Sequence, residues 1–264
     1  MHNAEVRAQE NTLLVVDQVG KQFGGLSALN NVSLSVRAGE IYGLIGPNGA
    51  GKTTLFNCMT GLYTVSSGAI HLNDVAVHNH KPHEVVARGF ARTFQNIRLF
   101  ANMTVLENVM VGRHIRSQAG VLGAVLRNAL TRAEEKNIRE RALYLLSRVG
   151  LDGKAQHLAG HLSYGLQRRL EIARALATDP SILALDEPVA GMNPSERRDM
   201  GELFLRLREE FRLTILLIEH DVKLVMCVCD KLAVLDYGCK ISEGTPQVVQ
   251  RDPAVIAAYL GGGK

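Results

Sequence analysis

The sequence predicts an α/β fold, and three observations indicate it. The N-terminal third is rich in strand patterns, the apolar period becomes helical from Thr104, and helices alternate with strands after Ser163. A chain of 264 residues with 46% hydrophobic residues is long enough for one large domain with a well-formed core.

The N-terminal third contains four predicted strands, at residues 13–16, 32–36, 41–45 and 69–72. Apolar residues alternate in the second of them, and a turn containing glycine precedes the third. We expect the third strand to be buried, because it is apolar throughout.

Residues 99–162 are predicted to form a helical lobe. Thr104 and Glu107 have the spacing of a capping box, and so do Thr131 and Glu134. In this motif the hydroxyl and the carboxylate each bind a backbone amide that the first helical turn leaves free.

After Ser163, alternating helices and strands predict a parallel sheet. Two buried strands are expected at 182–185 and 213–218, and Asn193 and Asp221 are expected to cap the helices that begin after them. A hairpin of residues 232–235 and 240–243 closes this part of the chain.

Charge and composition narrow the possible functions. The net charge of +4 is too small to indicate a nucleic-acid binder. Basic residues outnumber acidic ones nine to four between Arg98 and Arg148. A solvated helical face explains this excess more simply than a surface near phosphates, although both interpretations fit.

The sequence gives little support for a metal site, a signal peptide or a membrane-spanning segment. The four cysteines lack metal-ligand spacing, and His78, His80 and His83 are better explained by a solvated loop than by a zinc site. The first ten residues are too charged for a signal peptide, and polar residues interrupt the longest uncharged run, 53–73. The protein is expected to stay in the cytosol, and no segment of it is expected to cross a membrane.

A phosphate-binding loop is the strongest motif. Residues 46–53, Gly-Pro-Asn-Gly-Ala-Gly-Lys-Thr, match GxxxxGK[ST] between an apolar strand and a stretch compatible with a helix. Such glycines let backbone amides surround phosphates, while Lys52 reaches the β- and γ-oxygens and Thr53 offers a hydroxyl to Mg²⁺. The motif predicts nucleotide binding.

Further catalytic candidates follow predicted strands. Asp186 and Glu187 end a buried strand about 130 residues after the loop, which suits a carboxylate that holds the metal and one that activates water. His220 follows the next strand, where ligands bind in open α/β sheets. Gln95 could reach the metal or the water.

Together these motifs resemble the ATP-binding-cassette ATPases over essentially the whole chain. The discriminating segment is Leu-Ser-Tyr-Gly-Leu-Gln-Arg at 162–168, which resembles the signature motif of that family. The resemblance implies a RecA-like P-loop core, an N-terminal antiparallel β subdomain and an inserted helical subdomain. Within one domain of residues 1–264, it implies a β-rich lobe at 12–98, a helical lobe at 99–164, an α/β core at 165–246 and a helical tail at 247–264.

The resemblance also implies the ligands and the partners. Two cassettes would pack head to tail around two ATP molecules, with the signature of one touching the nucleotide of the other. Glu187, His220 and Gln95 would be catalytic, and Thr53, Gln95 and Asp186 would hold Mg²⁺. The implied nucleotide-binding residues are Phe23, Gly46, Pro47, Asn48, Gly49, Ala50, Gly51, Lys52, Thr53, Thr54, Ser163 and Gly165.

One branch of the family is especially similar, the branched-chain amino-acid importer ATPases. The segments that carry this resemblance are 91–100, 103–108, 190–194, 218–226 and 258–261, with the tyrosine of the signature. It implies two permeases, a second ATPase subunit in a heterodimer or else a second copy, a soluble binding protein reached indirectly, no nucleic acid, and a place on the cytoplasmic face of the cell membrane.

Three residues depart from the family pattern. Phe23 stands where an adenine-stacking tyrosine is usual and keeps the ring. Leu166 replaces a glutamine of the signature and is expected to extend the apolar face of its helix. Asn193 stands where an aspartate often crosses the dimer interface.

Other functions fit the sequence less well. A DNA-maintenance or translation-factor ATPase of the same family would need coiled-coil arms or a second cassette, for which the chain is too short. A GTPase would need an Asn-Lys pair, which the sequence lacks. Within transport, urea, amides, other amino acids and lipid export remain alternatives to leucine, isoleucine and valine.

Overall fold

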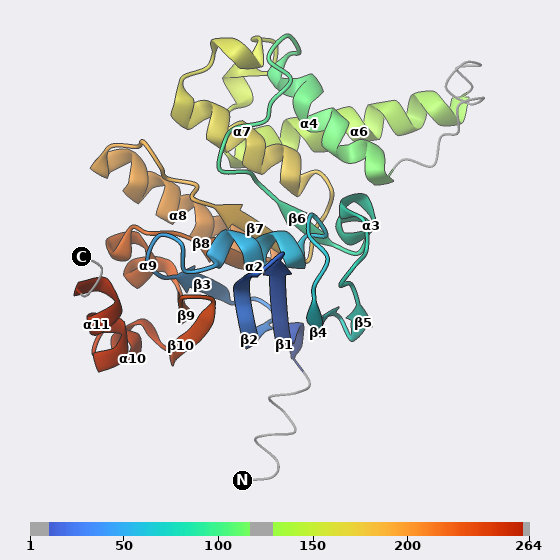
Figure 1. The fold of residues 1–264 in the computed structure, drawn as a ribbon. Coiled ribbons are helices and arrows are strands. Elements are labelled where there is room, and N and C mark those ends of the chain that lie inside the picture. Colours follow the sequence, from blue (N-terminus) through green and yellow to red (C-terminus); the bar gives the residue numbers. More distant parts are fainter. Residues whose placement is uncertain (1–10, 117–128, 261–264) are drawn as a thin grey trace.

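Two sheets organise the protein, whose computed structural model describes residues 11–116 and 129–260 (Figure 1). The four-stranded sheet is antiparallel, in the order β2-β1-β4-β5. It comprises β1 (Thr12–Phe23), β2 (Leu26–Arg37), β4 (Ser67–Leu72) and β5 (Val75–Ala76). Both β1 and β2 are longer than predicted, and β1 continues past polar residues through register shifts, one of them between Val16 and Val19.

The six-stranded sheet has the order β10-β9-β3-β8-β7-β6 and is parallel except for β10. Its strands are β3 (Ile41–Ile45), β6 (Phe90–Arg92), β7 (Ile182–Asp186), β8 (Thr214–Ile218), β9 (Lys231–Asp236) and β10 (Cys239–Gly244). The predicted α/β fold is therefore confirmed, and so is the predicted hairpin between β9 and β10.

The central strands are apolar throughout because both faces of the larger sheet are covered. In β7, Leu183 and Leu185 join the core shared with the helical lobe, whereas Ile182 and Ala184 join the core beneath the antiparallel sheet. Successive side chains of a strand point to opposite faces, so a strand buried on both sides needs apolar residues at every position.

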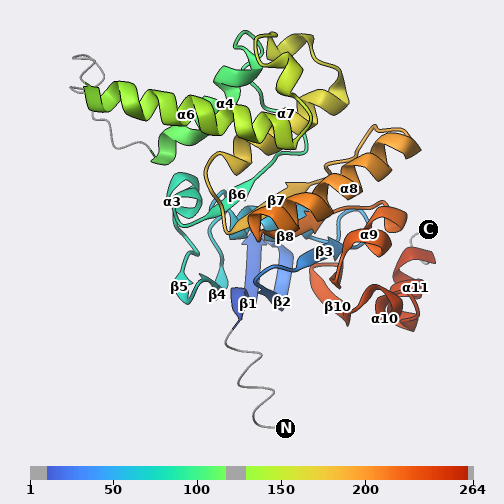
Figure 2. The ribbon, with the colours of Figure 1, turned by 180° about the vertical axis from the view of Figure 1, so that it is seen from behind.

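Some helices pack beside the two sheets, and others form a separate group (Figure 2). In both ribbon views α4, α6 and α7 form one lobe, while α8, α9, α10 and α11 lie beside the larger sheet. Their bounds are α2 (Lys52–Met59), α3 (Pro82–Ala87), α4 (Val105–Arg113), α6 (Ala129–Arg148), α7 (Tyr164–Leu176), α8 (Pro194–Phe211), α9 (Val222–Val228), α10 (Pro246–Val249) and α11 (Pro253–Leu260), with 3-10 turns at His114–Arg116, Asp152–Lys154 and Ala159–His161.

Most predicted helix starts are confirmed. The Glu107 amide donates to the Thr104 hydroxyl at 3.1 Å, and the Thr104 amide donates to the Glu107 carboxylate at 2.7 Å. Asn193 caps α8 in the same reciprocal way with Glu196, and the Asp221 carboxylate caps α9 by accepting the Leu224 amide. The prediction at Thr131 is wrong, because α6 already includes Ala129.

Several basic residues between Arg98 and Arg148 form ion pairs. Arg113 and Arg141 both pair with Asp179, and Arg148 pairs with Glu210 at 3.2 Å. These contacts join α4 and α6 to Asp179, just after α7, and to the end of α8, and they support the simpler explanation of the basic excess, a helical face.

The described part of the chain, 11–116 and 129–260, contains no helix that is both long and apolar enough to span a bilayer. Within the same residues, no three His, Cys, Asp or Glu side chains come together as a possible metal site.

Candidate functional site

The phosphate-binding loop joins β3 to α2 and depends on two glycines for its shape. Gly46 has φ 147°, and a Cβ there would lie 2.1 Å from the Leu235 carbonyl oxygen. Gly51 has φ 99°, and its Cβ would lie 2.8 Å from the Ala28 carbonyl oxygen. A side chain at either position would displace backbone, so these glycines let the loop close against the strands.

Lys52 lies buried within this loop. Its ammonium donates to the carbonyl oxygens of Gly46, at 2.7 Å, and Pro47, at 2.9 Å. Burial lowers the pKa of Lys52, while the carboxylates of Glu187 and Asp186 act in the opposite direction. The loop therefore holds a desolvated cation close to the space where phosphates would bind.

A cavity of about 650 Å³ lies against the loop. It has the size of a small-molecule site and contains both an aromatic wall and polar groups. The residues that line it are Phe23, Leu26, Ser27, Ala28, Asn48, Gly49, Ala50, Gly51, Lys52, Thr53, Thr54, Gln95, Glu187, Tyr237 and Gly238. The cavity thus gathers most of the predicted nucleotide-binding residues with two of the catalytic candidates.

The two acids at the end of β7 have different surroundings. Asp186 is almost fully buried, and its carboxylate lies 3.5 Å from the Arg92 guanidinium. Burial raises the pKa of Asp186, and Arg92 counteracts that rise. Glu187 adopts a left-handed backbone with φ 45°, which turns the chain sharply at the end of the strand.

Glu187 meets the other two catalytic candidates. The Gln95 amide nitrogen donates to its carboxylate at 2.9 Å, and His220 Nδ1 lies 3.8 Å from its other oxygen. The structure therefore brings together side chains that are far apart in the sequence. A carboxylate at the wall of a cavity can orient or deprotonate a water molecule bound beside it.

Four structural contributors to the site were missed in the sequence. Arg92 pairs with Asp186 and stacks its guanidinium 4.2 Å from the centre of the Phe56 ring. The fully buried Glu219 accepts the amides of Val189, His220 and Asp221 at 3.1–3.3 Å, which ties the loop after β8 to the loop after β7. The signal for each of them is a charged residue at the end of an apolar strand, Arg92 as the last residue of β6 and Glu219 directly after β8.

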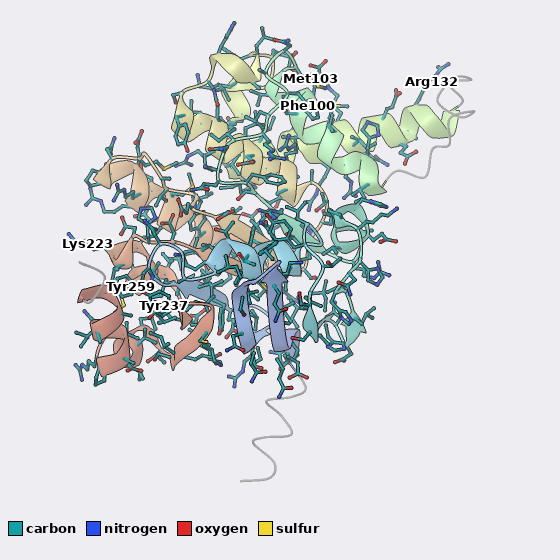
Figure 3. The ribbon with its side chains drawn as sticks, viewed as in Figure 1. Phe100, Met103, Arg132, Lys223, Tyr237 and Tyr259 are labelled. Carbon is teal, nitrogen blue, oxygen red and sulfur yellow. The ribbon has the colours of Figure 1, made fainter. Side chains whose placement is uncertain are left out.

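The other two contributors come from the C-terminal part of the chain. Tyr237 lines the cavity, and the amide of the next residue, Gly238, donates to the Ala50 carbonyl at 3.0 Å. Figure 3 labels Tyr237 and Tyr259 on the same side of the molecule. Burial raises the pKa of Tyr259, whereas a hydrogen bond from the Gly46 amide lowers it. No local sequence pattern signals these contacts.

The signature residues lie apart from this cavity. Ser163 and Gly165, at the start of α7, are not among the residues that line it. Leu166 packs against the core, which confirms the predicted extension of the apolar face. The Asn193 side chain accepts the amides of Ser195 and Glu196 at 2.9 and 3.0 Å, so this departure from the family pattern serves as a helix cap.

Phe23 is half exposed at the rim of the cavity and meets the Tyr63 ring edge to face, with centroids 5.2 Å apart. We expect Phe23→Ala to weaken ATP binding by about tenfold, because an aromatic stacking partner is lost. Phe23→Tyr should bind like the parent protein. Equilibrium binding of a fluorescent ATP analogue measures both variants, and equal affinity of Phe23→Ala and the parent would show that adenine does not stack there.

Comparisons with known proteins agree with this geometry. The family described as ABC transporter matches residues 29–190, and the family described as branched-chain amino acid ATP-binding cassette transporter matches residues 239–264. The high-affinity branched-chain amino acid transport ATP-binding protein LivG of Escherichia coli is 46% identical over 94% of this chain and 98% of its own length.

Solved structures show the same architecture. The ADP conformation of MJ1267, an ATP-binding cassette of an ABC transporter, has a TM-score of 0.82 and 34% identity, covering 95% of this chain and 99% of that one. A dimeric post-hydrolysis state of the cassette MJ0796, bound to ADP and Pi, has a TM-score of 0.74 and 26% identity, covering 89% and 99%. The chain therefore belongs to the ABC transporter family, in the group of branched-chain amino acid transport ATP-binding proteins, and it is an ATPase.

Proposed function

We propose that this ATPase powers the uptake of leucine, isoleucine and valine through partner permeases. The observation that carries the proposal is the likeness to LivG, which extends over 94% of the chain, together with the match of residues 239–264 to a family described by the same substrates. A subunit of this kind would act at the cytoplasmic face of the cell membrane as a peripheral protein.

The proposed cofactor is Mg²⁺ bound with ATP. Thr53, Gln95 and Asp186 offer only oxygen ligands, which this hard cation prefers. The buried Asp186 carboxylate has its Arg92 partner at 3.5 Å, beyond a normal hydrogen bond, so it suits a further cation. Bound there, Mg²⁺ would neutralise charge on the phosphate oxygens.

The catalytic roles follow from position. Glu187 would accept a proton from the attacking water, with Gln95 fixing the carboxylate from one side. His220 is exposed and lies within 4 Å of the same carboxylate, where it would contact the γ-phosphate. Lys52 and the loop amides would hold the phosphates in place.

The second nucleotide contact is proposed to lie on a partner cassette. Ser163 is exposed at the start of α7 and its hydroxyl makes no capping bond to that helix, which leaves the hydroxyl available to a ligand. Because helix N-termini attract anions, Ser163 and Gly165 would bind the γ-phosphate of ATP held by the other subunit. That subunit would be a second, different cassette, as the resemblance to the importer branch implies.

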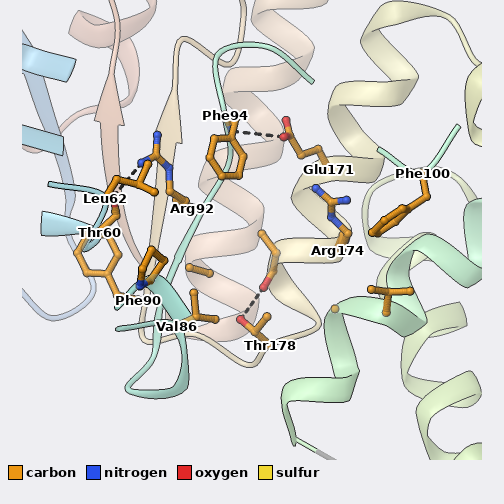
Figure 4. A pocket seen from close by; sticks show the side chains of 15 residues that line it. Thr60, Leu62, Val86, Phe90, Arg92, Phe94, Phe100, Glu171, Arg174 and Thr178 are labelled. Carbon is orange, nitrogen blue, oxygen red and sulfur yellow. Dashed lines mark hydrogen bonds between the residues drawn. The ribbon is translucent and has the colours of Figure 1, made fainter. Parts of the chain in front are cut away.

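A groove between β6 and the helical lobe is the proposed docking site for a permease. It has a volume of about 350 Å³ and is lined by Arg92, Phe94, Phe100, Glu171 and Arg174 among others (Figure 4). Phe100 is exposed, and the Arg174 guanidinium lies 5.8 Å from its ring centre. An apolar helix end with one acidic side chain would fit this mixture of aromatic and basic surface.

Purification of the tagged chain from its own host in mild detergent tests the transport proposal. Mass spectrometry should find two distinct permeases and a second cassette, and leucine uptake should depend on this chain. Uptake of urea or amides in place of leucine would move the substrate to a related class. Recovery of soluble partners alone would contradict transport.

The docking groove is tested in the same experiment. We expect Phe100→Asp to lower permease recovery by about tenfold, because a charge replaces an aromatic anchor. Lys223→Ala is the matched control, since Lys223 is exposed on α9, far from Phe100 in Figure 3. Full recovery with Phe100→Asp would place the permease elsewhere.

A further inference from the structure

A completely buried arginine lies in the first turns of α7. Arg168 Nη1 donates to the Phe94 carbonyl at 2.6 Å, and Nη2 donates to the Gln95 carbonyl at 2.7 Å and to the Tyr164 hydroxyl at 3.2 Å. The guanidinium thus joins the start of the signature helix to the segment that follows β6.

Glu171 completes this arrangement from the next turn of α7. One carboxylate oxygen accepts Arg168 Nη1 at 2.7 Å. The other accepts the Phe94 amide at 3.3 Å, a bond that Figure 4 shows. Arg168 and Glu171 are 0% and 1% exposed. A buried ion pair contributes little net stability, because desolvation offsets the attraction, but its directional hydrogen bonds fix the groups that they hold.

Gln95 is held at both ends. Its backbone carbonyl is bound by Arg168, and its side-chain amide donates to the Glu187 carboxylate at 2.9 Å. A continuous series of hydrogen bonds therefore runs from α7 through Arg168 and Gln95 to Glu187. A shift of the Gln95 backbone would move its amide away from the carboxylate.

We propose that Arg168 and Glu171 are positioning residues for ATP hydrolysis, which hold Gln95 so that its side chain orients Glu187. The inference rests on the roles proposed above for Gln95 and Glu187. It also gives α7 a second task, because the helix whose first turn would bind the partner's nucleotide also orients the carboxylate of its own chain. Loss of this link should slow hydrolysis without weakening ATP binding.

Arg168→Lys in the full-length chain tests the proposal. The lysine keeps the charge but lacks the planar fork that binds two carbonyls and a carboxylate together. We expect kcat to fall by about tenfold while KM for ATP stays within about twofold, because a small misplacement of a reacting group lowers the rate steeply. Glu171→Gln should give the same pattern and serves as a second variant if Arg168→Lys folds poorly.

The matched control is Arg169→Lys. Arg169 is the adjacent arginine, and its guanidinium donates to the Val149 carbonyl at 3.2 Å in the helical lobe. We expect this variant to retain the parent kcat. An equal loss of kcat in Arg169→Lys would mean that any arginine lost from α7 slows the enzyme, and would overturn the proposal.

Repeating the substitution in a Gln95→Ala background separates positioning from general packing. If Arg168 acts through the Gln95 side chain, Arg168→Lys should change kcat by less than about twofold once that side chain is gone. A loss of the same size in both backgrounds would overturn the proposal. An unchanged kcat in Gln95→Ala alone would also overturn it, whereas the role of Glu187 is tested separately by its own substitution.

Discussion

Glu187→Gln is expected to lower ATP turnover by about 100-fold or more while leaving ATP binding intact. Glutamine keeps the shape of the side chain but cannot accept a proton from water. Its amide still fills the place beside Gln95 and His220, so the walls of the cavity change little. Phosphate release measures turnover, and equilibrium binding measures affinity. Size-exclusion chromatography of this variant mixed with its partner cassette and ATP should show a trapped dimer.

Glu202→Gln is the matched control for this prediction. Glu202 is exposed on α8 and is not among the residues that line the nucleotide cavity. We expect it to hydrolyse ATP at the parent rate. If Glu187→Gln also retained the parent turnover, another group would have to activate the water.

Lys52→Ala should abolish nucleotide binding at ordinary ATP concentrations. The ammonium is buried among backbone carbonyls of the loop, so the charge that would meet the phosphates is already desolvated and directed by its surroundings. Without that charge the loop offers only amide dipoles to a highly charged ligand. Isothermal titration with ATP and with ADP measures the loss.

Lys223→Ala provides the comparison for this substitution, because it removes the same charge from an exposed site on α9. Both variants should unfold at temperatures close to that of the parent. Retained ATP affinity in a folded Lys52→Ala protein would show that the phosphates bind elsewhere.

The sequence predicts the fold well where a local pattern alone determines a strand or the start of a helix. The continuous apolar runs of β7 and β8 predict strands covered on both faces, and the caps at Thr104 and Asn193 mark the starts of α4 and α8. The prediction at Thr131 was wrong because a capping pattern also occurs inside a helix, and α6 already includes Ala129.

The sequence motifs predicted the residues that carry chemistry, but not the surrounding residues that hold them in place. Residues 46–53, Asp186 and Glu187 carry chemistry that restricts the residue type, so they stand out in a single sequence. Tyr237 lines the cavity next to Gly238, which binds the P-loop, and Tyr259 contacts Gly46, and no local pattern encodes these tertiary contacts. Arg92 and Glu219 are intermediate, since the sequence shows each only as a charged residue at the end of an apolar strand and does not show that the charge is buried.

The strand order has a consequence for synthesis of the chain. β3, which leads into the P-loop, is paired on one side with β8 and on the other with β9, and both are made long after it. At ribosomal rates the interval is roughly ten to thirty seconds, during which β3 has neither neighbour. ATP therefore cannot assist the folding of the nascent chain until its C-terminal third has emerged, and a chain that stops before β9 lacks the frame of its own nucleotide site.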